Sequence, residues 1–414
     1  MTGMRERDLL CGLFHAAVAA ADPAKVVPPH LPSPPPGRTL VLAAGKAAAS
    51  MARAVERRWP AEIEGMAVTR YGHGVECQRI EVVEAGHPLP DEAGQGGASR
   101  FLTAAARLGP EDLLLFLVSG GASALLVEPQ PGLGLIDKQT VNRALLAAGA
   151  PIAEMNCLRK HLSAIKGGRL AAAAAPARVA TLAISDVPGD DPAVIGSSPT
   201  AADPTTCADA LAIADRYDIE LPEVARTALE QGRWETVKPC DPCLARTDYV
   251  IVARPSDALA AAAASARALN LNVMNLGDDL HGEARDLGAA HADLACRHGL
   301  GALISGGEAT VTLNTPGGTG GPNLEYLLSL VVALDGASNV HAIACDTDGI
   351  DGFTNAAGAA IGPDTLARAH AAGMDAREML TRHDSYEFFR RLGDLVVTGP
   401  TRTNVNDFRA LLIA

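Results

Sequence analysis

Lys46 stands directly after a glycine, where an apolar run ends and a helical pattern begins. Residues 39–43 before it read as a buried strand, and residues 47–58 after it read as a helix. A cation at such a junction can reach a phosphate that lies at the start of the helix. A solvated surface lysine explains the spacing equally well. Lys46 is therefore a candidate for phosphate chemistry that other residues must support.

Two short loops concentrate aspartates around glycines, a pattern that could hold a cation. Their acidic residues are Asp186, Asp190 and Asp191 in the first loop and Asp346, Asp348 and Asp351 in the second. Crowded carboxylates repel one another unless a cation lies among them, and Mg²⁺ is commonly held by one or two carboxylates plus phosphate oxygens. The alternative is that these side chains cap turns and helix starts. The second loop lacks the Glu that ends a Ca²⁺-binding EF-hand loop.

Two glycine pairs follow apolar runs, one in each half of the chain. The segments are Ser119-Gly120-Gly121-Ala122-Ser123 and Ser305-Gly306-Gly307-Glu308. Glycine lets the backbone turn sharply and brings N–H groups close to a ligand. A helix is expected from Ala122 or Ser123, so its free N–H groups would favour an anion at the same spot. A tight turn needs glycine for structural reasons alone, but the repetition favours phosphate binding by both segments.

A basic stretch at residues 158–170 contrasts with the acidic chain around it. On a helix, Arg159 and Lys166 are seven residues apart and Lys160 is one residue further round, so the three share a broad face. A solvated helix face accounts for this spacing and is the interpretation that spacing alone favours. The alternative is that these cations lie near the Ser119 loop and bind phosphate or carboxylate.

Several common catalytic motifs are absent from the sequence. No G-x-x-x-x-G-K-[ST] occurs, so any nucleotide is held in another way. No complete G-x-G-x-x-G follows a strand, and the nearest segment, residues 318–322, ends in proline. There is also no G-x-S-x-G. The pair Cys240 and Cys243 lacks a second ligand pair, and the histidines show no metal-ligand spacing.

The elements that must position these residues alternate between strand and helix. Strands are expected at residues 39–43, 66–69, 80–84, 113–118 and 179–185, with helices at 47–58, 92–107, 138–148 and 152–165. This alternation predicts a doubly wound parallel sheet with helices on both faces. Ligands of such folds bind beyond the carboxyl ends of the strands. Lys46, the Ser119 loop and the Asp186 loop all follow strands and could therefore converge.

The second half alternates again after a connector at residues 236–246, where we place the domain boundary. Further strands are expected at residues 249–253, 272–276, 302–305, 309–313, 341–345 and 395–397. The sequence thus predicts an N-terminal α/β domain at residues 1–240 and a smaller C-terminal α/β domain at residues 241–414.

Length, composition and charge exclude several classes of protein. The chain has 414 residues, 48% of them hydrophobic, which fits a globular protein with two or three domains. Its formal charge of −13 argues against nucleic acid and anionic membrane as partners. The first 22 residues read as an amphipathic helix rather than a signal peptide. Eight scattered cysteines are typical of reduced thiols, so a cytoplasmic location is expected.

Taken together, these motifs resemble one family, the glycerate 2-kinases with a C-terminal MOFRL domain, whose members often carry the label hydroxypyruvate reductase. The resembling segments are AAGKAAASMA (43–52), VTRYGHG (68–74), EAGHPLPDEAG (84–94), VSGGASALL (118–126), LRKHLSAIKGGRLA (158–171), ISDVPGDDPAVIGSSPTAADPTT (184–206), ISGGEATVTL (304–313) and DTDGIDGFTNAAGA (346–359). They occur in order over nearly the whole chain, and several are long.

The resemblance implies a Rossmann-like N-terminal domain, a smaller C-terminal α/β domain and an active site in the cleft between them. It also implies transfer of a phosphoryl group from ATP, with Mg²⁺, to the 2-hydroxyl of D-glycerate. The essential lysine of the family corresponds to Lys46. A homodimer is one possible assembly, and a small molecule is the expected partner.

One departure from the family concerns the glycine-rich loop. Many members have G-G-R-N-Q-E, whereas this chain has proline at position 322 and asparagine at Asn323. The contact of the missing arginine must come from elsewhere or be absent. Arg159, Lys160 and Lys166 are the candidates, and Asn323 is a further candidate for substrate binding.

The resulting hypothesis follows the needs of phosphoryl transfer, which are positioning and charge neutralisation. The two glycine loops would hold phosphates, Lys46 would stabilise the moving phosphoryl group, and Asp186 would orient or deprotonate the hydroxyl. Mg²⁺ would lie on Asp190 or on the loop of Asp346 and Asp351. The rival interpretations are an NAD(P)H-dependent reductase of hydroxypyruvate or tartronate semialdehyde, and a non-catalytic ligand sensor.

Overall fold

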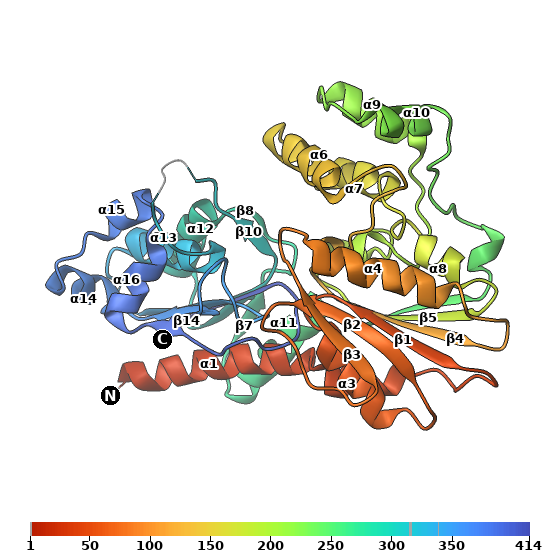
Figure 1. Cartoon of the computed structure of the whole chain (residues 1–414). Helices are drawn as coiled ribbons and strands as arrows, with labels where there is room; N and C mark the ends of the chain where they lie inside the picture. The colour runs from red at the N-terminus through yellow and green to blue at the C-terminus, as the bar shows by residue number, and fades with distance from the viewer. Residues whose placement is uncertain (1, 314–316, 338) are drawn as a thin grey trace. The chain divides into compact units, whose positions relative to one another are not determined.

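The computed structural model describes residues 2–313, 317–337 and 339–414, and the chain divides into two compact units (Figure 1). Pro23–Val252 forms the first, which we call the parallel-sheet unit. Met1–Asp22 and Ala253–Ala414 form the second, the mixed-sheet unit. The fold is α/β in both.

The parallel-sheet unit is built on six strands in the order β3-β2-β1-β4-β5-β6. The strands are β1 (Thr39–Ala44), β2 (Glu64–Arg70), β3 (Ile80–Ala85), β4 (Leu113–Val118), β5 (Arg178–Ile184) and β6 (Thr247–Ala253). The pairs β1–β2, β2–β3, β1–β4 and β4–β5 are parallel. The chain runs outward in one direction from β1 to β3 and in the other from β4 to β6, so the order reverses between β1 and β4. Open α/β sheets bind ligands at this reversal.

Helices cover both faces of this sheet because its central strands are apolar on both faces. Every residue of β1 and β4 is buried. Alternate β1 residues, Leu40, Leu42 and Ala44, pack with Phe101 of α4 (Glu92–Ala105) in one core. Helix α3 (Ala48–Arg58) covers the opposite face from α4 and α8 (Arg169–Ala174) (Figure 1).

A further helical layer of the same unit has its own apolar core. Its helices are α6 (Leu135–Ala147), α7 (Ile152–His161), α9 (Cys207–Arg216) and α10 (Glu223–Glu230). Leu145, Leu158 and Trp234 belong to that core. The unit's short helices are α2 (Pro23–Val26), α5 (Ala122–Leu125), η1 (Pro28–His30), η2 (Pro188–Asp190), η3 (Ile195–Ser197) and η4 (Pro242–Leu244). Helices α6 and α7 of this layer lie above the sheet in the view of Figure 1.

The mixed-sheet unit has six strands in the order β13-β12-β11-β14-β9-β7. The strands are β7 (Val273–Asn275), β9 (Gly301–Ser305), β11 (Val340–Asp346), β12 (Gly358–Ile361), β13 (Leu395–Val396) and β14 (Asp407–Ile413). Only the β7–β9 pair is parallel among these. Two short strands, β8 (His281–Glu283) and β10 (Glu308–Thr310), pair separately.

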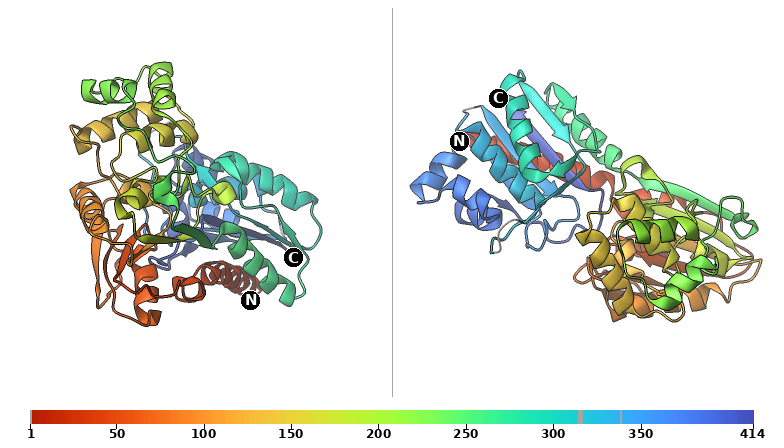
Figure 2. Two further views of the ribbon diagram at one scale, coloured as in Figure 1. Left: turned by 90° about the vertical axis from the view of Figure 1, so that its right-hand side faces the viewer. Right: turned by 90° about the horizontal axis from the view of Figure 1, so that it is seen from above.

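Helix α1 (Thr2–Ala20) belongs to the mixed-sheet unit, although it begins the chain. Its Leu10, Leu13 and Phe14 are buried, and Phe14 lies 6.1 Å from the ring of Phe408 on β14. The other helices of the unit are α11 (Pro255–Ala268), α12 (Ala284–Arg297), α13 (Pro322–Leu334), α14 (Thr365–Ala371), α15 (Ala376–Thr381) and α16 (Ser385–Leu392). Two further views show the two sheets and their helices (Figure 2).

The division into units differs from the expected boundary at residue 240 in two places. Residues 1–22 lie with the second unit because the apolar face of α1 is buried there. The strand expected at residues 249–253 is β6, which extends the first sheet rather than starting the second. Strands β8, β12 and β14 had no counterpart in the sequence-based expectation.

In the described residues no single helix is long and apolar enough to cross a membrane. One bent pair of helices, residues 5–20 with 23–30, has the length and composition of a membrane span.

Candidate functional site

The loops after β1 and β4 are fastened to each other at the reversal of the strand order. The N–H of Lys46 donates to Gly120 O at 2.8 Å, and the N–H of Ala47 donates to Ser119 Oγ at 2.9 Å. Gly45 has φ +123°, and a Cβ there would lie 2.3 Å from Ser119 Oγ, so only glycine allows this approach. The expected convergence of the Lys46 and Ser119 loops is therefore observed. The buried Ser119 side chain braces the Lys46 loop from within.

The loop after β4 presents backbone N–H groups that have no acceptor. Within the described residues, none lies in hydrogen-bond range of the N–H groups of Gly120, Gly121 or Ser123. Helix α5 is only one turn long, so the loop itself supplies the donors. A Cβ at Gly121 would lie 3.1 Å from His87 Nε2 and 3.2 Å from Lys46 Cγ. These side chains flank the donors, and the arrangement can bind an anion.

The loop after β9 differs from its counterpart after β4. The N–H of Gly306 donates to Gly277 O at 2.9 Å, and the N–H of Glu308 donates to Leu280 O at 3.0 Å. Ser305 is the last residue of β9, and Gly307 has φ +104°. The strand β10 follows this loop where a helix follows the other, so its donors are used in backbone pairing. The segment thus offers fewer free donors than its sequence indicated.

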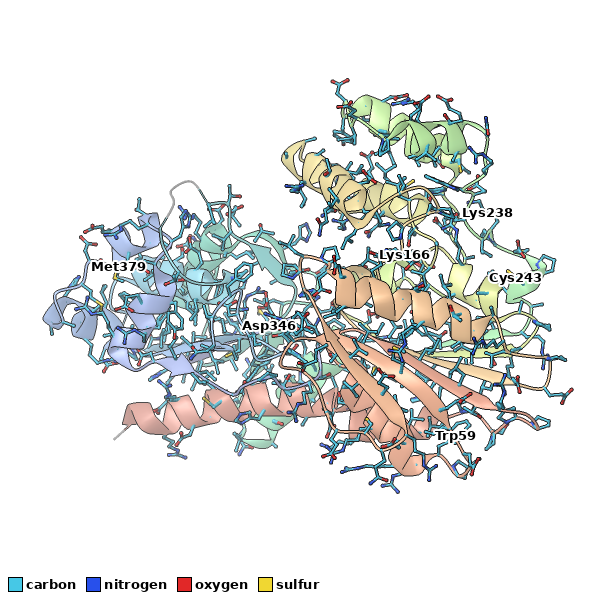
Figure 3. All side chains as sticks on the ribbon, viewed as in Figure 1. Trp59, Lys166, Lys238, Cys243, Asp346 and Met379 are labelled. Carbon is cyan, nitrogen blue, oxygen red and sulfur yellow. The ribbon has the colours of Figure 1, made fainter. Side chains whose placement is uncertain are left out.

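A cavity of about 450 Å³ opens over the loop after β4. Gly121 and Ser123 line it, together with residues of the loop after β3 and of α6. Four of its lining residues are cations, namely Lys138, Arg143, Arg159 and Lys166. Figure 3 labels Lys166 beneath the layer of α6 and α7. The basic stretch of the sequence therefore contributes to this cavity through Arg159 and Lys166.

Neutral groups hold these four cations in place. Lys166 Nζ donates to Ser123 O at 2.7 Å, and Lys138 Nζ donates to Leu162 O at 3.0 Å. Arg159 Nε donates to Asn142 Oδ1 at 2.7 Å. In the part of the chain that the structure describes, none of the four forms an ion pair with a carboxylate. The positive charge of Arg143 and Arg159 at this cavity is therefore not compensated by a paired carboxylate, although the chain as a whole is acidic.

Burial lowers the pKa values of Lys138 and Lys166. Burial, with the charges of Arg169 and Arg159, lowers the pKa of Lys138 to about 7. Burial, with the charges of Lys138 and Arg159, holds the pKa of Lys166 well below its usual range. A bound anion would favour the charged form of both.

Lys160 points elsewhere than its two basic neighbours. Its Nζ lies 2.6 Å from Asp203 Oδ1, and both side chains are buried. Burial raises the pKa of Asp203, but the hydrogen bond and charge of Lys160, together with the hydrogen bonds from Thr205, leave the pKa below its usual value. This ion pair ties α7 to the following segment, so the Lys160 ammonium already has a partner inside the unit, and its contact with substrate stays a prediction.

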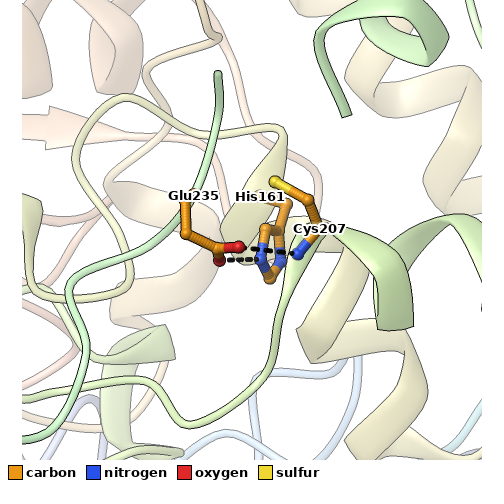
Figure 4. Close-up of side chains that lie close together, drawn as sticks. All are labelled: His161, Cys207 and Glu235. Carbon is orange, nitrogen blue, oxygen red and sulfur yellow. Dashed lines mark hydrogen bonds and ion pairs between the residues drawn. The ribbon is translucent and has the colours of Figure 1, made fainter. Parts of the chain in front are cut away.

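One cluster has the donor types of a metal site. His161, Cys207 and Glu235 bring a ring nitrogen, a thiol and a carboxylate within 4.8 Å of one another (Figure 4). Glu235 Oε1 already lies 2.7 Å from Lys238 Nζ and accepts from the N–H of Thr236 at 3.1 Å, while Oε2 accepts from the N–H of Cys207. The carboxylate of this cluster is therefore already paired with a lysine ammonium, and we interpret the cluster as a structural network.

In the mixed-sheet unit, Asp351 holds the start of α13. Its Oδ1 accepts from the N–H of Asn323 at 3.0 Å and its Oδ2 from the N–H of Leu324 at 2.9 Å. Asn323 Nδ2 also donates to Asp351 Oδ1 and to Asp407 Oδ1. Asp351 and Asn323 are both 1% exposed. Because both oxygens of Asp351 are used, it fits a helix cap better than the metal ligand that the sequence indicated.

Arg409 on β14 is a buried residue that the sequence reasoning missed. Its side chain is fully buried, donates to Gly306 O at 2.9 Å and pairs with Asp407. The guanidinium lies 5.3 Å from the ring centre of Tyr326. Arg409 thereby connects the loop after β9 to the start of α13. An arginine inside the apolar run 408–413 was a signal that could have been noticed.

The remaining acidic candidates keep partly exposed carboxylates. Asp186 lies two residues after the end of β5, and Asp190 has φ +56° in the turn η2. Asp346 ends β11, and its Oδ1 accepts from the N–H of Asp348 at 2.9 Å (Figure 3). Hard carboxylate oxygens at loop ends are ligands that Mg²⁺ accepts. Asp190 and Asp346 therefore fit the ion better than the buried Asp351.

Comparisons with known proteins agree with these motifs. Residues 9–230 match the family described as a domain of unknown function, DUF4147, and residues 301–407 match the MOFRL family. A protein of Agrobacterium vitis that carries the name hydroxypyruvate reductase is 54% identical over 98% of this chain and 94% of its own. The glycerate 2-kinase of Pyrococcus horikoshii is 40% identical over 89% of this chain and 86% of its own. The crystal structure of glycerate kinase from Thermotoga maritima has a TM-score of 0.88 at 35% identity, covering 99% of this chain and 100% of its own.

This chain belongs to the glycerate 2-kinase family. The departure at position 322 has a local explanation in this member of the family. Pro322 is the first residue of α13, where a missing N–H breaks no helical hydrogen bond. Its neighbour Asn323 is directed at two aspartates inside the unit rather than outward. The position that carries arginine in many glycerate 2-kinases therefore serves here to start a helix.

Substitution of Lys138 by Met is expected to flatten the pH dependence of stability. The pKa of Lys138 is about 7 in the folded protein and about 10.4 in the unfolded chain. The contribution of Lys138 to the free energy of unfolding is therefore fully present above about pH 10.4 and is lost as the pH falls through about 7. The wild type should gain up to about 5 kcal/mol between these limits relative to the variant. Urea unfolding of both proteins at pH 7 and 9.5 measures the difference. Parallel pH profiles would contradict the low pKa.

Proposed function

We propose that the protein transfers the γ-phosphoryl group of ATP to the 2-hydroxyl of D-glycerate and releases 2-phosphoglycerate and ADP. One observation carries the proposal. The loop of Lys46 is hydrogen-bonded to the loop after β4, whose N–H groups at Gly120, Gly121 and Ser123 have no acceptor among the described residues. Phosphoryl transfer depends on such positioned charge and donors more than on covalent chemistry. The glycerate kinases among its relatives support this reaction.

The roles of the residues follow from their positions. The loop after β4 would hold phosphate oxygens, and Lys46 would neutralise charge that develops on the transferred group. Asp186, at the end of β5 beside that loop's strand, would orient the acceptor hydroxyl or accept its proton. Mg²⁺, bound by Asp190 or Asp346, would supply charge neutralisation at the phosphates. Asp351 and Asn323 would maintain the start of α13.

Three further expectations come from the family resemblance and stay proposals. We propose that the parallel-sheet unit has a Rossmann-like fold, because its strand order 3-2-1-4-5-6 is that of dinucleotide-binding folds. We also propose that the loop after β9 is structural and does not bind phosphate. This changes the role expected of Ser305, Gly306, Gly307 and Glu308. A cytoplasmic location and an inter-domain active site remain predictions.

A reductase is the second candidate, because the names of two relatives favour it. Both are proteins of Agrobacterium vitis named hydroxypyruvate reductase, at 54% and 51% identity. Against it, no complete G-x-G-x-x-G follows a strand in this sequence. Lys46 and the open loop would suit an anionic hydroxyacid in either enzyme.

Two parallel assays distinguish the candidates. The purified protein is supplied with ATP, Mg²⁺ and D-glycerate in one, and with NADH or NADPH and hydroxypyruvate in the other. We expect ADP formation that requires D-glycerate, and no oxidation of NADH or NADPH above the rate without protein. Oxidation of the dinucleotide without any ADP formation would overturn the kinase and establish the reductase.

A further inference from the structure

The short helix η3 supports the loop after β4 from the side of the core. A Cβ added at Gly196 would lie 2.9 Å from Val118 Cγ2, at the end of β4, and 3.2 Å from Ala122 Cβ, at the start of α5. Ile195 is fully buried in the same apolar core as these two residues. Residues 195–198 therefore lie directly against the loop whose N–H groups are open.

Ser197 of this segment directs its hydroxyl at Ser123 of the loop. The two Oγ atoms are 2.7 Å apart. Ser197 is fully buried, whereas Ser123 is half-buried and lines the cavity over the loop. Among the described residues, Ser123 Oγ is the only hydrogen-bond partner of Ser197 Oγ. The pair therefore has one member in the core and one at the cavity.

Burial decides which of the two hydroxyls donates to the other. A serine hydroxyl has one proton to donate and two lone pairs that accept. If Ser123 donated, the proton of the buried Ser197 would have no acceptor, and a buried donor without a partner costs free energy. Ser197 therefore donates to Ser123, and the Ser123 proton stays available to a ligand in the cavity. A hydroxyl that accepts one hydrogen bond is also polarised and donates the next one more strongly.

Two adjacent residues hold both serines in register. Lys166 Nζ donates to Ser123 O at 2.7 Å, and the N–H of Gly167 donates to Ser197 O at 3.2 Å. Ser197 has φ +60°, a conformation that glycine adopts at no steric cost and serine rarely adopts. The feature that serine adds at this position is the hydroxyl, and its contact is with Ser123.

We propose that Ser197 is a positioning residue that fixes the Ser123 hydroxyl, so that its proton and the open N–H of Ser123 meet the same phosphate group. The inference rests on the proposed function, in which the loop after β4 holds phosphate oxygens. It adds to the backbone donors of that loop a hydroxyl donor that is oriented from within the core. Ser197 acts through Ser123 alone and was not selected by the sequence reasoning.

Ser197→Gly in the full chain tests the proposal, because glycine keeps the positive φ and removes only the hydroxymethyl group. Ser198→Gly is the matched control. Ser198 is the next residue, is also fully buried and has φ +58°, but its hydroxyl donates to Ala201 O. Ser123→Ala and the double variant Ser123→Ala/Ser197→Gly complete a double-mutant cycle. For each protein, calorimetric titration gives the Kd of the β,γ-imido analogue of ATP with Mg²⁺, and steady-state kinetics give kcat/KM for ATP.

We expect Ser123→Ala to raise the Kd of the analogue about tenfold, the loss of one charge-assisted hydrogen bond, and Ser197→Gly to raise it about fivefold. The double variant should match Ser123→Ala within about twofold, because Ser197 acts through Ser123, and the control should equal the wild type. Losses that multiply in the double variant would overturn the proposal. So would a Ser197→Gly protein that equals the wild type, or an equal loss in Ser198→Gly.

These outcomes separate the inference from the proposed function. The expected pattern of Kd values in a protein that forms no ADP from ATP and D-glycerate would uphold the inference and refute the kinase. Normal kcat/KM for ATP in every variant, with unchanged Kd values, would leave the kinase standing and overturn the inference. A wild type that does not bind the analogue would also overturn the inference.

Discussion

Substitution of Lys46 by Met is expected to lower kcat about 100-fold or more, the effect typical of removing one group that stabilises developing charge. Methionine keeps the length of the stem that lies against Gly121. The backbone N–H of residue 46 still donates to Gly120 O, so the loop should keep its conformation. KM for ATP should change much less than kcat, because the charge is needed most in the transition state.

The control for this variant is Lys25→Met, which removes an exposed lysine of α2 in the same unit. Thermal unfolding of all three proteins shows whether the fold is preserved. We expect equal midpoints within a degree or two and normal turnover of the control. A Lys46→Met enzyme with near-normal kcat would remove Lys46 from the mechanism.

Substitution of Asp351 by Ala is expected to destabilise the protein by about 3 kcal/mol. The buried N–H groups of Asn323 and Leu324 lose their acceptor, and the side-chain amide of Asn323 loses one of its two acceptors. A buried donor without a partner costs about 1–3 kcal/mol. Urea unfolding followed by circular dichroism measures the loss, with the transition that shifts assigned to the mixed-sheet unit.

The pH dependence of this loss gives a second test. Burial, together with the nearby carboxylate of Asp407, raises the pKa of Asp351 to about 7 against hydrogen bonds that lower it. In the unfolded chain the pKa of Asp351 is about 3.9, which is below its folded value. The stabilisation that Asp351 provides is therefore fully present below about pH 3.9 and is lost as the pH rises through about 7. The variant should therefore differ from the wild type more at pH 5 than at pH 8.

Asp375→Ala is the matched control, because Asp375 also caps a helix of the mixed-sheet unit but is exposed. It accepts from the N–H groups of Arg377 and Glu378 at the start of α15. Its loss should cost about 1 kcal/mol. An Asp351→Ala protein of normal stability whose activity requires far more Mg²⁺ would show that Asp351 is a metal ligand after all.

The sheet of the parallel-sheet unit could be predicted because its signal is local. The runs that form β1 and β4 are apolar at every position, as strands buried on both faces must be. The glycines after them predicted the turns, and the rule for carboxyl ends predicted that Lys46 and the Ser119 loop meet. These inferences needed no knowledge of distant contacts.

The misplaced elements depended on contacts between distant segments. Residues 247–253 form a strand in either domain, and only pairing in three dimensions assigned β6 to the first sheet. Strand β14 was missed because Asp407 and Arg409 interrupt its apolar pattern, and the two side chains form an ion pair with each other inside the fold.

The same limit applied to single residues of the site. The spacing of Arg159, Lys160 and Lys166 gave no means of knowing that Asp203, 43 residues further on, pairs with Lys160 alone. Likewise, Asp351 and Asp346 share a loop and look alike in sequence. Their different roles depend on the start of α13, which lies 27–28 residues before Asp351.

The most direct test of the central claim identifies the position of the new phosphate ester. Purified protein is incubated with D-glycerate, ATP and Mg²⁺, and the product is coupled to enolase alone or to phosphoglycerate mutase followed by enolase. We predict an equal signal from both couplings, since enolase accepts 2-phosphoglycerate directly. A signal that appears only when the mutase is present would mean phosphorylation of the 3-hydroxyl and would contradict the assignment.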